Sequence, residues 1–241
     1  MYSPQGRVVL TLAGLALALT ACGPTTDGTA TESTGAEEGG PPVVMERGSM
    51  SDLNGTVVDP TLPRPEQDLR DTRGRRFSLD HRPEDELTLL FFGYTHCPDL
   101  CPTTMADLAA ARGQLPETLQ EDVTVVFVSE DPERDTPRAL RKWLDGFDPS
   151  FVGLRGGNQQ TETMLKELYL PETVRVESPE DPVEHPDDGG HHHEHGDYGV
   201  DHAGVVYAFA PGDVTVIYTG GTTPIEYAAD FQTLLGTEQE R

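Results

Sequence analysis

Two continuous apolar runs stand out in the middle of the chain, Leu87–Tyr94 (LTLLFFGY) and Val123–Ser129 (VTVVFVS). Charged or polar residues bound both runs, and neither run alternates between polar and apolar positions. Short unalternating runs of this kind are typical of strands that are buried on both faces of a sheet. The pattern therefore predicts two buried strands.

The segments between and after these strands carry apolar residues at helical spacing. One helix is predicted over Pro102–Leu115, and a second begins at Thr136-Pro137, a pair typical of a helix cap followed by a first-turn proline. Two further helices are predicted over Thr161–Tyr169 and Pro224–Leu235. Strands and helices thus alternate along this part of the chain.

Two hairpins complete the predicted elements. A small one is expected near Asp68–Leu79, and in the other Val205–Ala210 and Val214–Tyr218 flank a Pro-Gly-Asp turn. Buried strands that alternate with helices, closed by a hairpin and a helix, predict a three-layer α/β domain with a mixed central sheet. The order of elements is similar to that of thioredoxin-like domains, and we expect this domain to occupy residues 52–237.

The start of the chain has the pattern of a lipoprotein signal peptide. Arg7 precedes the apolar run Val8–Leu19, which is too short to cross roughly 30 Å of hydrocarbon as a helix. The run ends in Leu19-Thr20-Ala21-Cys22, which resembles the bacterial lipobox. We expect residues 1–21 to be removed and Cys22 to be lipidated, with the protein on the extracytoplasmic face of the cell membrane. An ordinary signal peptide with an incidental cysteine is the alternative.

Two stretches have the composition of exposed chain. Residues 22–51 are rich in Thr, Gly, Glu and Pro and are predicted to be a disordered acidic tether. Residues 171–201 are strongly acidic and are predicted to be a long exposed loop inserted in the domain. This loop carries a cluster of histidines that could form an auxiliary site for copper, nickel or zinc, with a merely solvated acidic loop as the alternative. The cluster consists of His191, His192, His193 and His195.

The net charge excludes one class of partner. The chain has 42 acidic and 17 basic residues among 241, which gives a formal net charge of −25. Phosphate backbones would repel so acidic a protein, so nucleic acid is not an expected partner. Hydrophobic residues make up 35% of the chain, enough to fill one core.

The candidate chemistry begins at Cys97 and Cys101, where the first buried strand leads into a helix. A spacing of four residues places two thiols within reach of a disulfide or of one soft metal ion. The start of a helix lowers the pKa of a thiol, so we expect both cysteines to ionise readily. The spacing alone leaves metal binding, redox chemistry and a plain structural disulfide open.

His202 supplies a third candidate ligand. It comes just before the predicted strand Val205–Ala210, at the edge of the sheet that is expected to face the cysteines. A disulfide reductase of this fold would carry a proline there, and this chain has none between Asp187 and Pro211. Two sulfurs and one imidazole nitrogen suit Cu(I), or Cu(II) with added ligands.

Three motifs resemble the Sco/SenC family: FGYTHCPDLCPTTM at Phe92–Met105, SEDPERDTP at Ser129–Pro137 and VDHAGVVYAFAPGD at Val200–Asp213. The resemblance extends over roughly residues 57–235. It implies a membrane-attached, thioredoxin-like copper chaperone that serves the Cu(A) centre of cytochrome c oxidase. Such a protein is not an enzyme. The partner would be the oxidase subunit that carries Cu(A), or another copper chaperone.

By the same resemblance, Cys97, Cys101 and His202 ligate copper, and the two cysteines can also form a redox disulfide. The protein would deliver copper, reduce the cysteines of the oxidase so that copper can enter, or do both. Two other functions stay open, a thiol–disulfide oxidoreductase for extracytoplasmic protein thiols and a copper or redox sensor.

The chain departs from the family pattern at Glu130, where a hydrophobic or small residue is usual, and at Ala203, where serine is usual. The histidine-rich loop is not a general family feature either. We interpret Asp131 and Asp135 as turn and cap residues rather than residues that shape the site. Four further residues are not expected to be metal ligands. His81 and His96 should lie at the surface, and Met105 and Met164 should lie in the core.

Overall fold

The computed structural model describes residues 52–177 and 198–236. The predicted signal peptide, Cys22 and the predicted tether lie outside these residues. The histidine cluster at 191–195 lies outside them as well. None of the helices in the described ranges is both long and apolar enough to cross a membrane.

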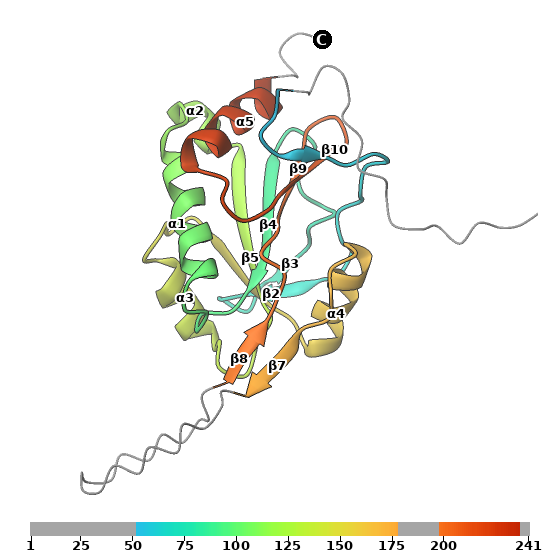
Figure 1. Ribbon diagram of the computed structural model, residues 1–241, viewed down its shortest axis with the longest axis vertical. Helices are drawn as coiled ribbons and strands as arrows, with labels where there is room; N and C mark the ends of the chain where they lie inside the picture. Colours follow the sequence, from blue (N-terminus) through green and yellow to red (C-terminus); the bar gives the residue numbers. More distant parts are fainter. Residues whose placement is uncertain (1–51, 178–197, 237–241) are drawn as a thin grey trace, which may run out of the picture. The chain divides into compact units, whose positions relative to one another are not determined.

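A mixed sheet of eight strands forms the centre of the described structure, in the order β1-β10-β9-β4-β5-β6-β2-β3 (Figure 1). The three central strands β4, β5 and β6 are parallel, and the strands that flank them are antiparallel. Both predicted central strands are confirmed. The bounds are β1 (Thr56–Val57), β2 (Leu69–Asp71), β3 (Arg76–Phe77), β4 (Leu87–Gly93), β5 (Val123–Ser129), β6 (Val152–Arg155), β9 (Val206–Ala210) and β10 (Val214–Tyr218).

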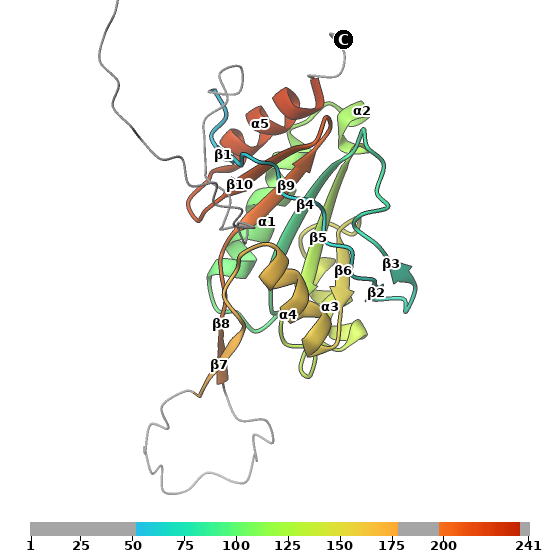
Figure 2. The ribbon, with the colours of Figure 1, turned by 90° about the vertical axis from the view of Figure 1, so that its right-hand side faces the viewer.

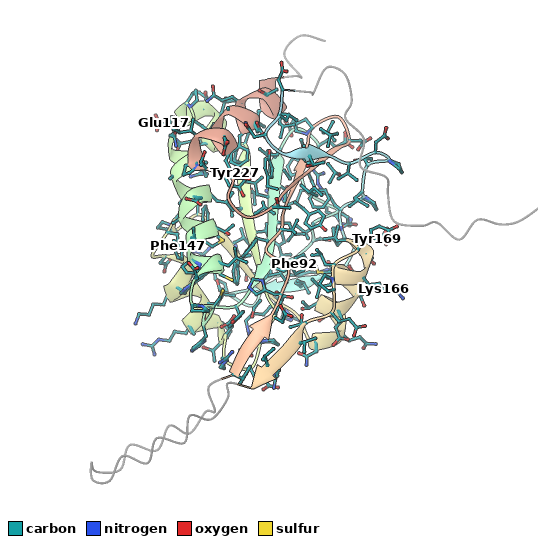
Figure 3. All side chains as sticks on the ribbon, viewed as in Figure 1. Phe92, Glu117, Phe147, Lys166, Tyr169 and Tyr227 are labelled. Carbon is teal, nitrogen blue, oxygen red and sulfur yellow. The ribbon has the colours of Figure 1, made fainter. Side chains whose placement is uncertain are left out.

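Helices cover both faces of this sheet, so the predicted three-layer arrangement is confirmed (Figure 2). Alternate residues of β4 point to opposite faces, as in any strand. Leu89 and Phe91 pack with α1, α3 and α5, whereas Leu90 and Phe92 pack with α4. In Figure 3, Phe92 lies inside the molecule, whereas Tyr169 is at the surface. The helices are α1 (Leu100–Gly113), the short α2 (Glu117–Gln120), α3 (Pro137–Leu144), α4 (Asn158–Glu167) and α5 (Pro224–Gly236).

Both predicted hairpins are present. β2 pairs with β3, and β9 pairs with β10 through the register Ala210↔Val214. The connection between β9 and β10 places Gly212 and Asp213 at φ 72° and 56°. Glycine and aspartate tolerate this left-handed conformation, which tight hairpin turns require.

Strand β6 was not predicted from the sequence. Its four residues include Gly153, which interrupts the apolar pattern. A Cβ atom on Gly153 would lie 2.7 Å from Leu144 Cδ1 of α3, so the glycine allows the helix to pack directly on the strand. The close packing that stabilises β6 thus also removes the sequence signal for it.

The prediction that residues 171–201 form a loop is wrong near both ends, although Val174 and Val176 are exposed as expected. β7 (Val174–Glu177) and β8 (Tyr198–Asp201) form an antiparallel two-stranded ribbon, seen at the bottom of Figure 1. Val200 is buried and packs in the core, although its neighbours in sequence are glycine and aspartate. β8 runs directly into His202, so the ribbon matters for the site.

Candidate metal site

Three parts of the chain bring Cys97, Cys101 and His202 together. Cys97 lies in the turn between β4 and α1, Cys101 is in the first turn of α1, and His202 follows the end of β8. Because α1 begins only at Leu100, Cys97 lies outside the helix and the two cysteines do not share a helical face. The backbone N–H of Cys101 instead donates to Cys97 Sγ at 3.4 Å.

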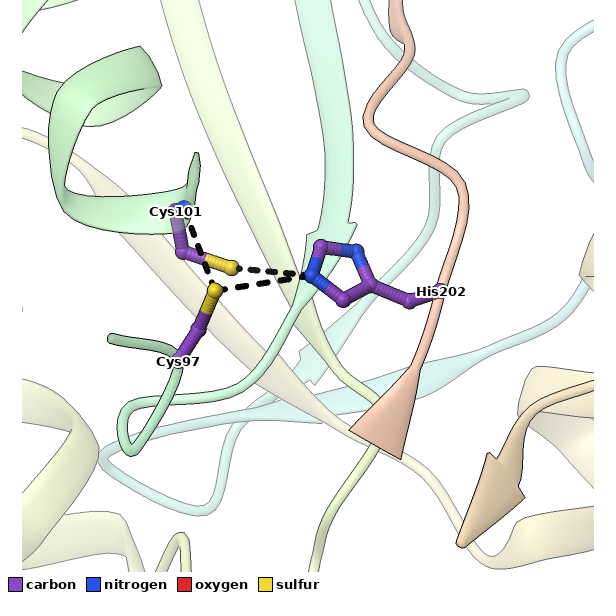
Figure 4. A group of neighbouring side chains, drawn as sticks. All are labelled: Cys97, Cys101 and His202. Carbon is purple, nitrogen blue, oxygen red and sulfur yellow. Dashed lines mark hydrogen bonds between the residues drawn. The ribbon is translucent and has the colours of Figure 1, made fainter. Parts of the chain in front are cut away.

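The ligand atoms of these three residues converge (Figure 4). His202 Nε2 lies 3.6 Å from Cys97 Sγ and 3.5 Å from Cys101 Sγ. All three atoms lie within 4.8 Å of one another, and both cysteines are free thiols. Sequence reasoning therefore identified the residues that form this cluster. In the described ranges, no other histidines, cysteines or acidic residues form a group with this geometry.

The topology of the sheet explains why these residues meet. β9 pairs with β4, so the segment that enters β9 passes beside the end of β4 and the turn that carries Cys97. Gly93 ends β4, and a Cβ atom there would lie 2.6 Å from Cys101 Sγ. The absence of a side chain at this position gives the sulfur its room.

Aromatic rings enclose His202. Tyr94 and Phe91 contact the imidazole edge-on, with ring centroids 5.6 and 6.2 Å away. Burial lowers the pKa of His202. The backbone of Ala203 acts as a hydrogen-bond acceptor would and raises this pKa, but burial has the larger effect. The imidazole is thus neutral at neutral pH and can offer a lone pair to a metal ion.

Cys101 is buried next to Cys97 and His202, and its burial affects how readily its thiol ionises. Burial raises the pKa of the Cys101 thiol well above its ordinary value. The prediction that the start of the helix would make both cysteines ionise readily is therefore wrong for Cys101. Desolvation disfavours the charged thiolate more strongly here than the helix N-terminus favours it.

Asp135 positions the turn that carries the cysteines. It is fully buried, and it accepts hydrogen bonds from the backbone N–H and the hydroxyl of Thr95 and from the Ser129 hydroxyl. These bonds connect the turn after β4 to the end of β5. Burial raises the pKa of Asp135 even though the hydrogen bonds act in the opposite direction. Its interpretation as a cap residue is wrong, because Thr136 caps α3.

Asp131 connects the same region to the ribbon. Its carboxylate pairs with Arg134 and accepts a hydrogen bond of 2.8 Å from the Tyr198 hydroxyl. The Arg134 guanidinium also stacks over the Tyr198 ring, 3.6 Å from its centroid. Asp131 is 1% exposed, so it is a buried anchor rather than a simple turn residue.

Glu130 was noted only as a departure from the family pattern, yet it lies next to the cluster. Its side chain is 1% exposed, and Oε2 lies 3.7 Å from His202 Nδ1. The Thr173 hydroxyl donates to Oε1 at 2.8 Å. Burial raises the pKa of Glu130 to about 7, and the bond from Thr173 opposes that shift. Thr173 had no signal in the sequence.

The remaining residues lie where the sequence placed them. The side chains of His81 and His96 are 78% and 55% exposed, so neither is buried in the cluster. Met105 and Met164 are completely buried in the core. Two thiol sulfurs and an imidazole nitrogen are a donor set suited to copper, because soft ligands select Cu(I) and imidazole also binds Cu(II).

Comparison with known proteins points to one family. The sequence pattern of the SCO1/SenC family matches residues 63–236. A Stutzerimonas stutzeri protein whose name assigns it copper binding is 31% identical over 175 residues, which cover 71% of this chain and 76% of that protein. The mitochondrial SCO1 homologue 1 of Arabidopsis thaliana is 34% identical over 126 residues, which cover 52% of this chain and only 32% of that protein.

A solved structure supports the same likeness. Bradyrhizobium japonicum ScoI with copper bound is 28% identical to this chain, with a TM-score of 0.54. The match covers 72% of this chain and 98% of that one. The likeness confirms the predicted thioredoxin-like fold with its mixed central sheet.

Proposed function

The chain belongs to the SCO1/SenC family, and from this membership we propose that Cys97, Cys101 and His202 bind copper for the Cu(A) centre of cytochrome c oxidase. One observation carries the proposal: His202 Nε2 lies within 3.6 Å of both thiol sulfurs. Of the relatives described above, one is named for copper binding and another was solved with copper bound. The donor set of this chain fits the same ion.

In this proposal copper is cargo, and the protein is a metallochaperone rather than an enzyme. The three side chains hold the ion until a partner with better-placed ligands removes it. The partner is the oxidase subunit that carries Cu(A), or another copper chaperone. Thiol–disulfide exchange by Cys97 and Cys101 would also let the protein reduce the oxidase cysteines before copper enters.

One contact favours a second candidate function, a thiol–disulfide oxidoreductase. The backbone N–H of Cys101 points at Cys97 Sγ, and such a donor stabilises a thiolate. An oxidoreductase needs both cysteines, but its exchange rate would not depend on His202. A copper or redox sensor, the third candidate, would change its surface with redox state instead of transferring metal. Dependence on His202 therefore discriminates copper binding from thiol–disulfide exchange, and metal transfer to a partner discriminates the chaperone from the sensor.

The experiment is an anaerobic Cu(I) titration of the reduced full chain in detergent, with a competing chelator. His191, His192, His193 and His195 are first replaced by Asn, so that only one class of site remains. We expect one tight equivalent in this background. Adding His202→Ala should weaken binding by at least tenfold, because one of three ligands is lost.

The matched control is His96→Ala, which removes an exposed histidine from the cysteine turn itself. It should bind copper like the background chain. Equal affinity with and without His202 would contradict the copper site. If disulfide exchange were then fast in both variants, the oxidoreductase would be the better description.

We also infer that Cys22 anchors the protein to the extracytoplasmic face of the cell membrane through lipid. The support is the apolar run Val8–Leu19 followed by Leu19-Thr20-Ala21-Cys22. Two or three acyl chains bind membranes stably, since each buried CH₂ contributes about 0.8 kcal/mol. Replacing Cys22 by Ser should move the protein from the membrane pellet to the supernatant, and continued pelleting would argue against a lipid anchor.

A further inference from the structure

Glu130 places a carboxyl group inside the protein beside the candidate metal site. It follows β5 directly, and its backbone N–H donates to the Gly93 carbonyl at 2.8 Å, which fixes it to the end of β4. Its side chain is 1% exposed. A buried carboxyl group is costly unless its oxygens have partners, so its surroundings should show what it does.

Only one of the two carboxyl oxygens has such a partner. Oε1 accepts the hydroxyl of Thr173, the residue that leads into β7. Oε2 is inaccessible to solvent and has no hydrogen bond to the part of the chain that the structure describes. If Glu130 served only to attach the ribbon to β5, Oε2 would have no role.

Oε2 lies close to a complementary group on the far side of the His202 ring. Nδ1 lies 3.7 Å away and is also buried without a hydrogen-bond partner among the described residues. Nε2, on the opposite side of the ring, faces both sulfurs (Figure 4). A distance of 3.7 Å exceeds a hydrogen bond, but a shift of less than about 1 Å would make one.

We propose that Glu130 is a positioning residue that accepts the Nδ1–H of His202 and thereby directs the lone pair of Nε2 at Cys97 and Cys101. Neutral imidazole carries one proton, so an acceptor at Nδ1 fixes the tautomer in which Nε2 is free to bind a metal. Metal-binding histidines in general need such a partner, which orients the ring and strengthens the ligand.

The backbone of Ala203 is the competing acceptor, since it also interacts with the ring. The two possibilities differ in what a substitution at position 130 does. If Ala203 sets the tautomer, removing the carboxyl group changes nothing at His202. If Glu130 sets it, Nδ1 loses its acceptor and the proton redistributes between the two nitrogens.

The test reads the tautomer directly, in the reduced, metal-free full chain labelled with ¹⁵N-histidine. The His202 signals are assigned by their loss in His202→Gln. We expect the Nδ1–H tautomer to predominate in the wild type and in Glu130→Gln, which keeps an acceptor oxygen. Glu130→Val has no acceptor oxygen, so the ¹⁵N signals of the two ring nitrogens should move towards those of a mixture of tautomers.

The matched control is Glu133→Gln, a nearby exposed glutamate that pairs with Arg175 on the ribbon. It should leave the His202 signals unchanged. A wild-type tautomer in Glu130→Val would overturn the proposal and assign the orientation to Ala203. The proposal would also be overturned if Glu130→Gln kept no more of the Nδ1–H form than Glu130→Val does.

A second measurement extends the inference to metal and rests on the proposed function. Glu130→Val should weaken Cu(I) binding by roughly 10–100-fold, the usual effect of losing an outer partner of a metal ligand. Unchanged affinity would overturn the role of Glu130 in binding. The tautomer experiment needs no metal, so its result stands even if the chain proves not to bind copper.

Discussion

At the scale of single residues, the site depends on one absent side chain. Gly93 ends β4 where Cys101 Sγ approaches the backbone, and a Cβ atom there would lie 2.6 Å from the sulfur. Rings close the remaining space, because the same Cβ atom would be 3.1 Å from Phe91 and 3.3 Å from Phe127. The sulfur has to move if this position gains a methyl group.

We therefore predict that Gly93→Ala damages metal binding. Overpacking a tightly packed interior costs about 1–3 kcal/mol of stability. Rotating Cys101 away from His202 should also weaken Cu(I) binding by about tenfold or more, and each tenfold corresponds to about 1.4 kcal/mol. Urea unfolding of the metal-free chain and the anaerobic titration measure the two effects separately.

Gly113→Ala is the matched control, since a Cβ atom on Gly113 at the end of α1 meets nothing within 4 Å. It should retain both the wild-type copper affinity and the wild-type stability to within about 1 kcal/mol. If Gly93→Ala bound copper as tightly as this control, the position of Cys101 Sγ would not matter for the site.

The sequence reveals the candidate ligands but not what surrounds them. Cys97 and Cys101 could be predicted because they follow a recognisable strand where a helix begins, and His202 because it precedes another recognisable strand. Glu130 lies in SEDPERDTP, where five charged residues suggest an exposed turn. Its contacts with Thr173 and His202 link segments far apart in the chain, so no local pattern reports them.

At the scale of elements, the predictions hold where an element carries its own signal. β4 and β5 are continuous apolar runs, and α1 buries Met105, Leu108 and Ala111 at helical spacing. β6 is short, contains Gly153, and owes its place to the neighbours β5 and β2. Such a strand forms because partners are present, and that information lies elsewhere in the chain.

The ribbon of β7 and β8 was missed because residues 171–201, in which both strands lie, are strongly acidic as a whole. Its attachment depends on side-chain contacts that only the folded chain creates. Arg134 stacks over Tyr198 of β8 and lies 5.7 Å from the Tyr94 ring, while Thr173 bonds to Glu130. The ribbon is thus fixed to the same residues that surround His202, so the site and the ribbon form one unit of structure.

At the scale of the whole molecule, the net charge of −25 favours cations over anions near the protein. This attraction is weak beyond about 10 Å at 0.1 M salt, so it cannot select copper over other cations. Selection has to come from ligand type, which in this sequence means the cysteine and histidine side chains. Besides the candidate site, His191, His192, His193 and His195 offer such ligands, although they lie outside the described residues.

We propose that this histidine cluster is a second, weaker copper site that supplies the first. Deleting residues 187–197 should lower the total number of Cu(II) equivalents bound at saturation. One tight Cu(I) equivalent should remain, because Cys97, Cys101 and His202 are untouched. Equilibrium dialysis against buffered Cu(II), followed by the anaerobic Cu(I) titration, gives both numbers on the same preparation.

The effect of the histidines has to be separated from that of the acidic residues, because the deletion removes both. Replacing the four histidines by Asn keeps the length and the acidic side chains but removes the imidazole nitrogens, which bind Cu(II) far better than isolated carboxylates do. This variant should lose the same equivalents as the deletion. If both variants keep the wild-type stoichiometry, the cluster binds no copper. If only the deletion loses equivalents, the acidic residues hold the weak copper and the histidines do not.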